Sequence, residues 1–262
     1  MKKNSENTTS PANPVSGVSP VDLIQFAKTT SNFLANKKTE RKAFNDLAHF
    51  PLIPGKQAIY VMDWQQNRVT YQRNIEGMLG YPKNEFDDSI IHTHIHPDDI
   101  NVVSRVIKGV VDHYTHFNAT SINTYLTISY RLLKRDGTPI KVLRQSGAYE
   151  TMGNGKLISN WSLITDIGFI SNNNQIEWDV NANEVDRQKF KEKVYLEFQD
   201  YFSNKELLVI TGIKKGLKSS EIANQLFISK HTVDTHRKNI LRKCNCNNKE
   251  QLLAFCYRNG IF

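Results

Sequence analysis

Long hydrophobic runs are absent from this chain of 262 residues. No segment approaches the roughly 18 to 20 consecutive apolar residues that span a bilayer. Met1 to Asn4 include two lysines, but polar residues follow where a signal peptide has its apolar core. We therefore predict a cytoplasmic protein with no membrane partner.

Cysteine is also scarce. The three cysteines, Cys244, Cys246 and Cys256, all lie near the C-terminal end. Three thiols in this position do not make a disulfide framework, and such a composition is typical of a reducing compartment. We expect free thiols.

Catalytic signatures are missing as well. The sequence has no phosphate-cradling Gly-rich loop and no Gly-x-Ser-x-Gly elbow. Its N-terminal half lacks the repeated β-α alternation of a phosphoacceptor receiver domain. The missing loop and elbow predict that the chain is not an enzyme, and nothing in it predicts a cofactor. The missing receiver pattern predicts that the chain is not controlled by aspartyl phosphorylation of its own residues.

Positive charge is present in excess and is confined to one end. The net charge is +8. Residues 187–262 contain 15 Lys and Arg against 7 Asp and Glu, which leaves 34 − 15 = 19 against 26 − 7 = 19 for residues 1–186. Localised positive charge favours binding to a polyanion, because neutralised phosphates release counterions. A basic but merely solvated surface is the alternative.

The length suggests two domains, and the pattern changes along the chain. Residues 1–20 are polar and rich in Ser, Asn, Thr and Pro, which predicts a disordered tail. Residues 21–55 carry apolar residues near a helical period until Pro51 and Pro54, which predicts one or two helices.

Residues 56–168 have the pattern of short β-strands. We predict strands at 58–62, 68–71, 125–133, 140–148 and 157–165, with helical stretches at 75–79 and 98–111. Asp136-Gly137 is a strong hairpin signal between the third and fourth strands. The predicted order is two strands, a helical insertion and a three-stranded meander.

Five short motifs follow one another in this region: Asn74 to Tyr81, Glu85-Phe86, His96-Pro97-Asp98-Asp99, Tyr130-Arg131-Leu132-Leu133 and Asp136-Gly137. With these motifs in this order, the region resembles a PAS domain. The resemblance implies a sensor domain and allows a small-molecule ligand there. The absence of cysteine from residues 1–243 excludes the covalent flavin chemistry of light-sensing relatives.

Residues 169–201 are predicted to form a linker. From Asn174 to Tyr201 the sequence is charged, and Phe190, Val194, Phe198 and Phe202 recur every four residues. This spacing predicts a linker helix with one apolar seam. The seam either packs against its own chain or pairs with a second subunit.

Residues 202–262 predict four helices. Ser203 and Glu206 form a capping-box pattern, Ser229 is a natural N-cap of a third helix, and Asn248 is one of a fourth. Two short helices joined by a tight turn, with a polar and basic outer face on the second, are typical of a helix-turn-helix reader of the major groove.

A longer motif runs through these four predicted helices: Gly216-Leu217, Glu221-Ile222-Ala223, Leu226-Phe227-Ile228-Ser229, Thr232-Val233, His236-Arg237, Asn239-Ile240-Leu241 and Lys243. With this motif the segment resembles the LuxR-type DNA-binding domain of bacterial transcription regulators. The resemblance implies that outward residues of the third helix contact DNA.

The candidate DNA contacts divide into two roles. Lys230, Thr232, His236 and Arg237 can donate to phosphate oxygens, while Asp234, Thr235 and Lys238 are placed to meet base edges. The full candidate set is Ser219, Ser220, Ser229, Lys230, Thr232, Asp234, Thr235, His236, Arg237, Lys238 and Arg242.

Three departures from the family pattern matter. Lys218 stands where the family often has a capping hydroxyl, so we expect Ser219 to cap the second helix. Asp234 replaces a residue that is frequently basic or Glu, so the target sequence cannot be taken from relatives. Cys244 and Cys246 replace an apolar turn and are interpreted as small core residues, with a redox or metal switch as the alternative.

His92, His94 and His96 alternate along the chain and form a candidate metal site. The competing interpretation places His96 in the His-Pro-Asp-Asp turn and the other two on a solvated loop, and we favour it.

The predicted fold class is α+β: a PAS-like antiparallel sheet domain with a helical insertion, and an all-α four-helix LuxR-type helix-turn-helix domain. The predicted function is transcription regulation, with a homodimer bound to double-stranded DNA. A signalling protein that acts through a protein partner instead of DNA is the alternative.

Overall fold

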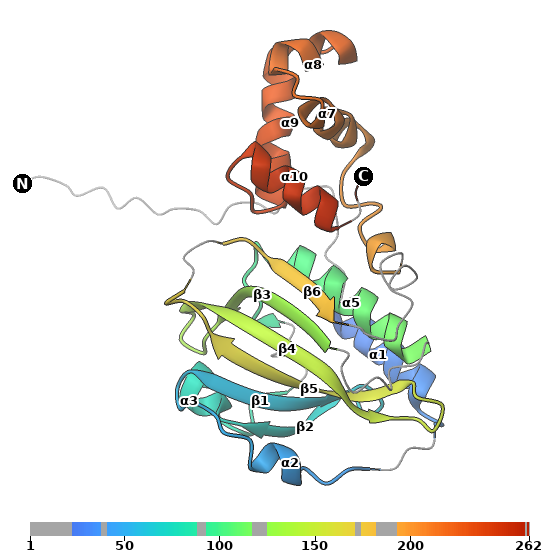
Figure 1. Cartoon of the computed structure of the whole chain (residues 1–262), viewed down its shortest axis with the longest axis vertical. Coiled ribbons are helices and arrows are strands. Elements are labelled where there is room, and N and C mark those ends of the chain that lie inside the picture. Colours follow the sequence, from blue (N-terminus) through green and yellow to red (C-terminus); the bar gives the residue numbers. More distant parts are fainter. Residues whose placement is uncertain are drawn as a thin grey trace, which may run out of the picture.

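The computed structural model describes residues 23–37, 41–87, 93–116, 125–170, 174–181, 193–259 and 261 (Figure 1). The tail expected over residues 1–20 lies outside the described residues. The remainder forms a sheet domain with its helices, followed by four helices at the C-terminal end.

An antiparallel sheet of six strands occupies the N-terminal part. The strands are β1 (Gln57–Asp63), β2 (Arg68–Arg73), β3 (Tyr125–Leu133), β4 (Pro139–Thr151), β5 (Leu157–Asp166) and β6 (Glu177–Asn181), in the spatial order β2-β1-β5-β4-β3-β6. Helices α3 (Ile75–Leu79) and α5 (Ile100–His116) lie between β2 and β3 in the chain. The predicted two strands, helical insertion and meander are confirmed.

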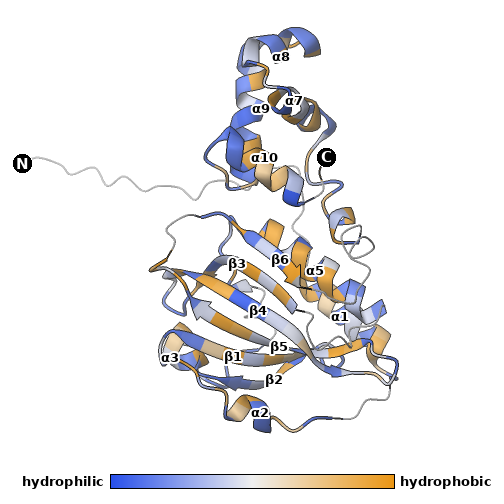
Figure 2. Cartoon of the chain, viewed as in Figure 1, coloured by the Kyte–Doolittle hydropathy of each residue, from blue (hydrophilic) through white to orange (hydrophobic). Residues whose placement is uncertain are grey.

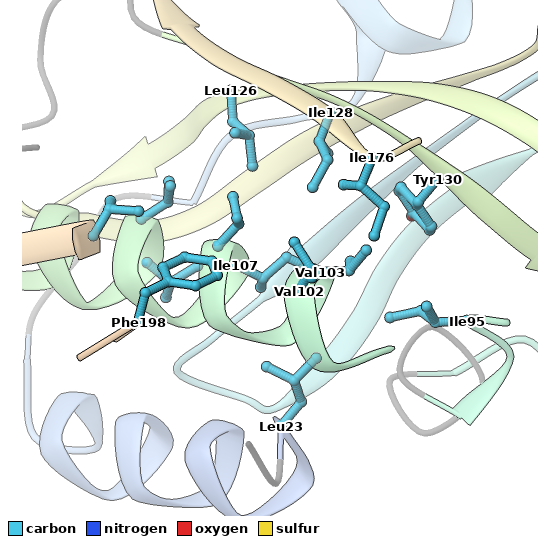
Figure 3. Packing of buried hydrophobic residues seen from close by; sticks show 14 of the residues in the cluster. Leu23, Ile95, Val102, Val103, Ile107, Leu126, Ile128, Tyr130, Ile176 and Phe198 are labelled. Atoms are coloured by element: carbon cyan, nitrogen blue, oxygen red, sulfur yellow. The ribbon is translucent and has the colours of Figure 1, made fainter. Parts of the chain in front are cut away.

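Each face of the sheet has its own apolar cluster, because strand residues alternate between faces. Helix α5, with α1 (Leu23–Leu34) against it, covers the face that includes Ile128 and Tyr130. Figure 3 shows Ile107 of α5 below Leu126 of β3, with Leu23 on the far side of α5. A smaller cluster of Leu47, Ile59, Val61 and Tyr149 covers the opposite face near α2 (Asn45–Ala48).

The His-Pro-Asp-Asp element ties the start of α5 to β3. Asp99 is fully buried and accepts hydrogen bonds from the backbone N–H of Arg131 at 2.7 Å and from its Nη2 at 2.6 Å. A buried carboxylate requires such partners, since an unpaired charge is costly to bury. This pairing fixes the helical insertion on the sheet.

The prediction of a linker helix over residues 169–201 is wrong for its first part. Residues 177–181 form β6, which pairs with β3 from Ser129↔Glu177 to Tyr125↔Asn181. Trp178 and Val180 alternate with charged residues, so they pack on the sheet while Asp179 stays outside. Edge pairing with β3 is a long-range effect that local periodicity does not reveal.

The apolar seam of residues 193–202 packs within its own chain. Val194, Phe198 and Phe202 are all at most 3% exposed, while Phe190 lies outside the described residues. Of the two alternatives for this seam, pairing with a second subunit therefore does not apply to these three side chains.

Candidate nucleic-acid interface

Residues 193–202 form the connecting segment between the sheet and the C-terminal helices. Four helices follow it: α7 (Asn204–Lys214), α8 (Ser219–Leu226), α9 (Lys230–Lys243) and α10 (Lys249–Arg258). The predicted capping box starts α7, because Ser203 Oγ accepts from the Glu206 N–H and Glu206 Oε2 accepts from the Ser203 N–H at 2.8 Å. Asn248 likewise caps α10 by accepting from the Gln251 N–H at 2.9 Å.

Glu206 also ties α7 to the end of α9. Lys243 Nζ lies 2.7 Å from Glu206 Oε2, and Glu206 is 5% exposed. Burial opposes the charged form of this carboxyl, but the bonds from Lys243 and Ser203 outweigh burial and lower the pKa of Glu206. The carboxylate is thus held charged in the folded domain.

The start of α8 differs from the prediction. Its N-cap is Lys218, not Ser219, and Ser219 is the first helical residue. Glu221 Oε2 accepts from the Lys218 N–H at 2.6 Å, so a carboxylate from inside the helix satisfies the amide where no capping hydroxyl is present.

A tight turn separates α8 from α9. Phe227 ends α8 in the left-handed conformation, with φ of 53°. Ser229 then caps α9, as predicted, because its Oγ accepts from the Thr232 N–H at 3.0 Å. Gly212 allows α7 and α8 to approach closely, since a Cβ there would lie 2.7 Å from Ile222 Cγ1.

Helix α9 has a narrow buried side and a wide outer side. Val233 and Ile240 are fully buried, and the outer side is coloured as hydrophilic in Figure 2. The structure places every candidate DNA contact on α8, its turn or α9. Ser220, Ser229, Lys230, Asp234, Thr235, Lys238 and Arg242 are exposed, and Ser219, Thr232, His236 and Arg237 are half-buried.

Sequence reasoning missed His231. It is exposed and shares a helical face with Thr235, Lys238 and Arg242, because the spacings of four, seven and eleven residues return to one side of a helix. Thr235 Oγ1 donates to the His231 carbonyl at 3.0 Å. The same spacing rule could have identified this residue.

The sheet domain meets the helical domain at the opposite end from α8. Arg258 Nη1 donates to the Ile176 carbonyl at 3.0 Å, Trp178 Nε1 to Asn259 Oδ1 at 3.0 Å, and Asn245 Nδ2 to the Asn174 carbonyl at 2.8 Å. In Figure 1, α10 lies next to the sheet and α8 lies at the far end of the molecule. The beginning of α9 therefore faces away from the sheet.

The three cysteines are buried and unpaired. Burial raises the pKa of Cys256 to about 12 and raises that of Cys244 well above its ordinary range. Hydrogen bonding with Cys244 lowers the pKa of Cys246. Cys244 and Cys246 are 3% and 7% exposed and lie in the apolar core, in agreement with their interpretation as small core residues.

The structure describes two of the three histidines of the candidate metal site, since His92 lies outside the described residues. The His94 and Tyr81 ring centres are 4.9 Å apart in an edge-on arrangement, and His96 Nδ1 lies 3.6 Å from Asp98 Oδ2. In the part of the chain that the structure describes, no three His, Cys, Asp or Glu side chains gather as metal ligands would. Nor is any helix in that part long and apolar enough to cross a membrane.

Comparison with known families identifies the C-terminal helices. Residues 200–256 match the family of bacterial regulatory proteins, luxR family. The uncharacterized transcriptional regulatory protein YxjL of Bacillus subtilis is 42% identical over 65 residues, which cover 25% of this chain and 30% of YxjL. The putative positive transcription regulator of virulence factors BvgA of Bordetella pertussis is 32% identical over 59 residues, or 22% of this chain and 28% of BvgA. The chain thus spans under a third of the length of these curated relatives.

Two solved structures are similar over the sheet domain or beyond it. The N-terminal domain of a diguanylate cyclase with a PAS/PAC sensor from Marinobacter aquaeolei has a TM-score of 0.36 and 21% identity, covering 44% of this chain and 97% of that one. The VqmA dimer of Vibrio cholerae, a LuxR-type receptor, has a TM-score of 0.33 and 14% identity, covering 84% of this chain and 89% of that one. Residues 200–256 are thus a helix-turn-helix domain of the luxR family of bacterial regulatory proteins, and the chain joins this domain to an antiparallel six-stranded sheet domain.

Proposed function

We propose that this chain is a transcription regulator that binds double-stranded DNA with α9 in the major groove. The observation that carries the proposal is the exposed outer side of α9, where Lys230, Lys238 and Arg242 lie on a helix whose buried side is fixed in the domain core. A helix fits the width of the major groove, and basic residues neutralise its phosphates.

The candidate DNA contacts divide into side chains that would meet phosphates and side chains that would meet base edges. Lys230, Thr232, His236 and Arg237 would contact phosphates together with Ser219, Ser220 and Ser229 near the turn. Asp234 would accept from a cytosine N4, and Lys238 would donate to guanine. Arg242 Nη2 donates to Asn239 Oδ1 at 3.0 Å, which orients the guanidinium along the outer side of α9.

We infer that the chain binds as a homodimer controlled by its PAS-like domain. One helix-turn-helix module contacts few base pairs, and a two-fold axis doubles the site. A route for control runs through the connecting segment: Arg105 of α5 bonds to Asp200 Oδ1 at 2.7 Å, and Tyr201 bonds to the Lys243 carbonyl at the end of α9.

The experiment is a titration of a DNA duplex of mixed sequence with the full chain, in which fluorescence anisotropy of the duplex reports binding. Replacing Lys230, Lys238 and Arg242 together with Ala should weaken binding by at least about tenfold, because three positive charges that face the DNA are lost. The matched control replaces the exposed Lys28, Arg68 and Lys83 of the sheet domain with Ala, which removes the same charge.

The two triple variants separate the proposal from its rival. Equal weakening by both would mean that net charge, not α9, drives binding. Failure of the unmodified chain to bind any duplex would favour the signalling protein that acts through a protein partner.

A further inference from the structure

A cavity lies between α5 and the sheet, away from the proposed DNA interface. Its empty volume is about 480 Å³, including the space at its mouth. The walls are mostly apolar, with Ile107 and Val110 from α5 and Leu126 and Leu157 from the strands. Figure 3 shows Ile107 and Leu126 between α5 and the sheet.

Arg144 is the charged residue among the side chains that line the cavity. It is 4% exposed and lies on β4, which has strands on both sides in the sheet. Strand alternation places Arg144 on the same face as Val142 and Ser146, so its side chain points toward α5 and not to solvent. A guanidinium stays protonated in proteins even when it is buried.

No acidic side chain among the described residues neutralises the charge of Arg144. Its Nε donates to Ser146 Oγ at 2.9 Å and to Ser162 Oγ at 3.2 Å, and Nη1 has no hydrogen-bond partner among the described residues. No carboxylate in that part of the chain pairs with it, whereas the buried Arg105 and Arg131 each have an Asp.

The neighbouring phenols do not supply an anion either. Tyr130 hydrogen bonds the guanidinium, and the Tyr60 ring centre lies 5.7 Å from Arg144 Cζ. Burial raises the pKa of Tyr130 to about 12 despite the opposing effect of Arg144, so this phenol is neutral at physiological pH. Burying an unpaired charge is unfavourable, and an incoming anion would offset that cost.

We propose that this cavity binds a small organic monocarboxylate. Its carboxylate accepts from the Arg144 guanidinium beside Ser146, and its apolar part lies against Ile107, Val110 and Leu157. The binding site does not depend on DNA binding, but its role as the input of a regulator rests on the proposed function above.

Helix α5 provides a path from the cavity to the helical domain. Its cavity side carries Ile107 and Val110, while Gly109 on its other side is in close contact with the connecting segment, where a Cβ would lie 3.0 Å from Val194 Cα. Lys108 Nζ lies 2.6 Å from Glu197 Oε1 of the same segment. A displacement of α5 by a ligand would therefore reach residues 193–202 directly.

The test is a thermal-shift and calorimetric screen of the full chain with butyrate, hexanoate and benzoate, each beside its neutral amide. We expect at least one carboxylate to raise Tm by about 2–4 °C at saturation and to bind at least about tenfold more tightly than its amide. Arg144→Gln should abolish that preference, and Arg68→Gln, at an exposed site, should keep it.

A second variant covers the case in which Arg144→Gln does not fold. Ala148→Leu keeps the guanidinium and fills the cavity, so it should abolish carboxylate binding. The proposal is overturned if no carboxylate binds at about 10 mM, or if inorganic phosphate binds and the carboxylates do not. It is also overturned if an amide binds as tightly as its acid, or if Ala148→Leu binds the carboxylate as tightly as the unmodified chain. DNA affinity, measured separately with and without the bound carboxylate, shows whether the regulatory proposal fails while the site stands.

Discussion

At the scale of single residues, Glu206 performs two tasks in the helical domain. It completes the cap of α7 and pairs with Lys243 at the end of α9. Its pKa is lowered from the ordinary value of 4.5, so folding favours the charged form. The resulting stabilisation is present above pH 4.5 and is lost as the pH falls through the lowered pKa.

Glu206→Gln should therefore weaken the acid sensitivity of the chain. The free energy of unfolding, measured with urea, should fall less between about pH 7 and about pH 3 in this variant than in the unmodified chain. Glu250→Gln, at an exposed position in the first turn of α10, is the control. An unchanged pH dependence in Glu206→Gln would show that this carboxyl has an ordinary pKa.

Replacing Lys238 should change the discrimination between DNA sequences, whereas replacing Lys230 should change the affinity for all of them. Lys238→Ala should reduce discrimination between the preferred duplex and single-base variants by about 1–3 kcal/mol. Lys230→Ala should weaken all duplexes equally, because phosphate contacts carry no sequence information. Binding to duplexes selected from a random pool measures both effects. If Lys238→Ala weakened binding to all duplexes equally, Lys238 would not read bases.

Two residues, His231 and Arg144, show which single positions can be predicted from the sequence and which cannot. His231 was within reach of a spacing rule, since it repeats with Thr235 and Lys238. Arg144 was not, because an Arg in a strand is normally exposed, and only the pairing of β4 between β3 and β5 shows that this one is buried.

At the scale of elements, α7 and α8 can cross closely because Gly212 has no side chain. A Cβ at Gly212 would lie 2.7 Å from Ile222 Cγ1, in a fully packed part of the domain. Gly212→Ala should destabilise the chain by about 1–3 kcal/mol despite its better helix propensity. Gly77→Ala is the matched control, because nothing lies within 4 Å of a Cβ there and the change should be neutral or stabilising.

Urea unfolding of the two glycine variants decides this point. Equal effects would mean that Ile222 moves aside without cost, and that α7 and α8 do not need the close approach.

Elements with strong local signals were predictable, and elements formed by distant pairing were not. The five predicted strands and the four C-terminal helices carry their own periodicity, turns and caps. Strand β6 has five residues in a charged segment, and it exists because it adds to the edge of β3 some fifty residues earlier in the chain. Lys218 shows the same limit, since Glu221 replaces the hydroxyl cap that local rules expect.

At the scale of the whole molecule, Arg105 holds the connecting segment on α5. Its guanidinium bonds to the Glu197 carbonyl and Asp200 and lies 5.4 Å from the centre of the Tyr201 ring. Arg105→Ala should speed amide hydrogen exchange across residues 194–201 by about tenfold or more, because the segment opens more often. The control is Arg135→Ala, which removes the surface pair with Glu85.

Unchanged exchange in Arg105→Ala would show that apolar packing of Val194 and Phe198 alone fixes the segment. In that case Arg105 would not belong to the route from the sheet domain to α9.

The central claim is that the outer side of α9 binds DNA through phosphate neutralisation and base contact. The most direct measurement is the affinity of the full chain for a duplex across a series of salt concentrations. We predict that the logarithm of the association constant falls linearly with the logarithm of salt concentration, with a slope of about −0.9 for each phosphate contact, and that Lys230→Ala reduces the slope by about one unit. An affinity that does not change with salt, or a slope unaffected by Lys230→Ala, would contradict the claim.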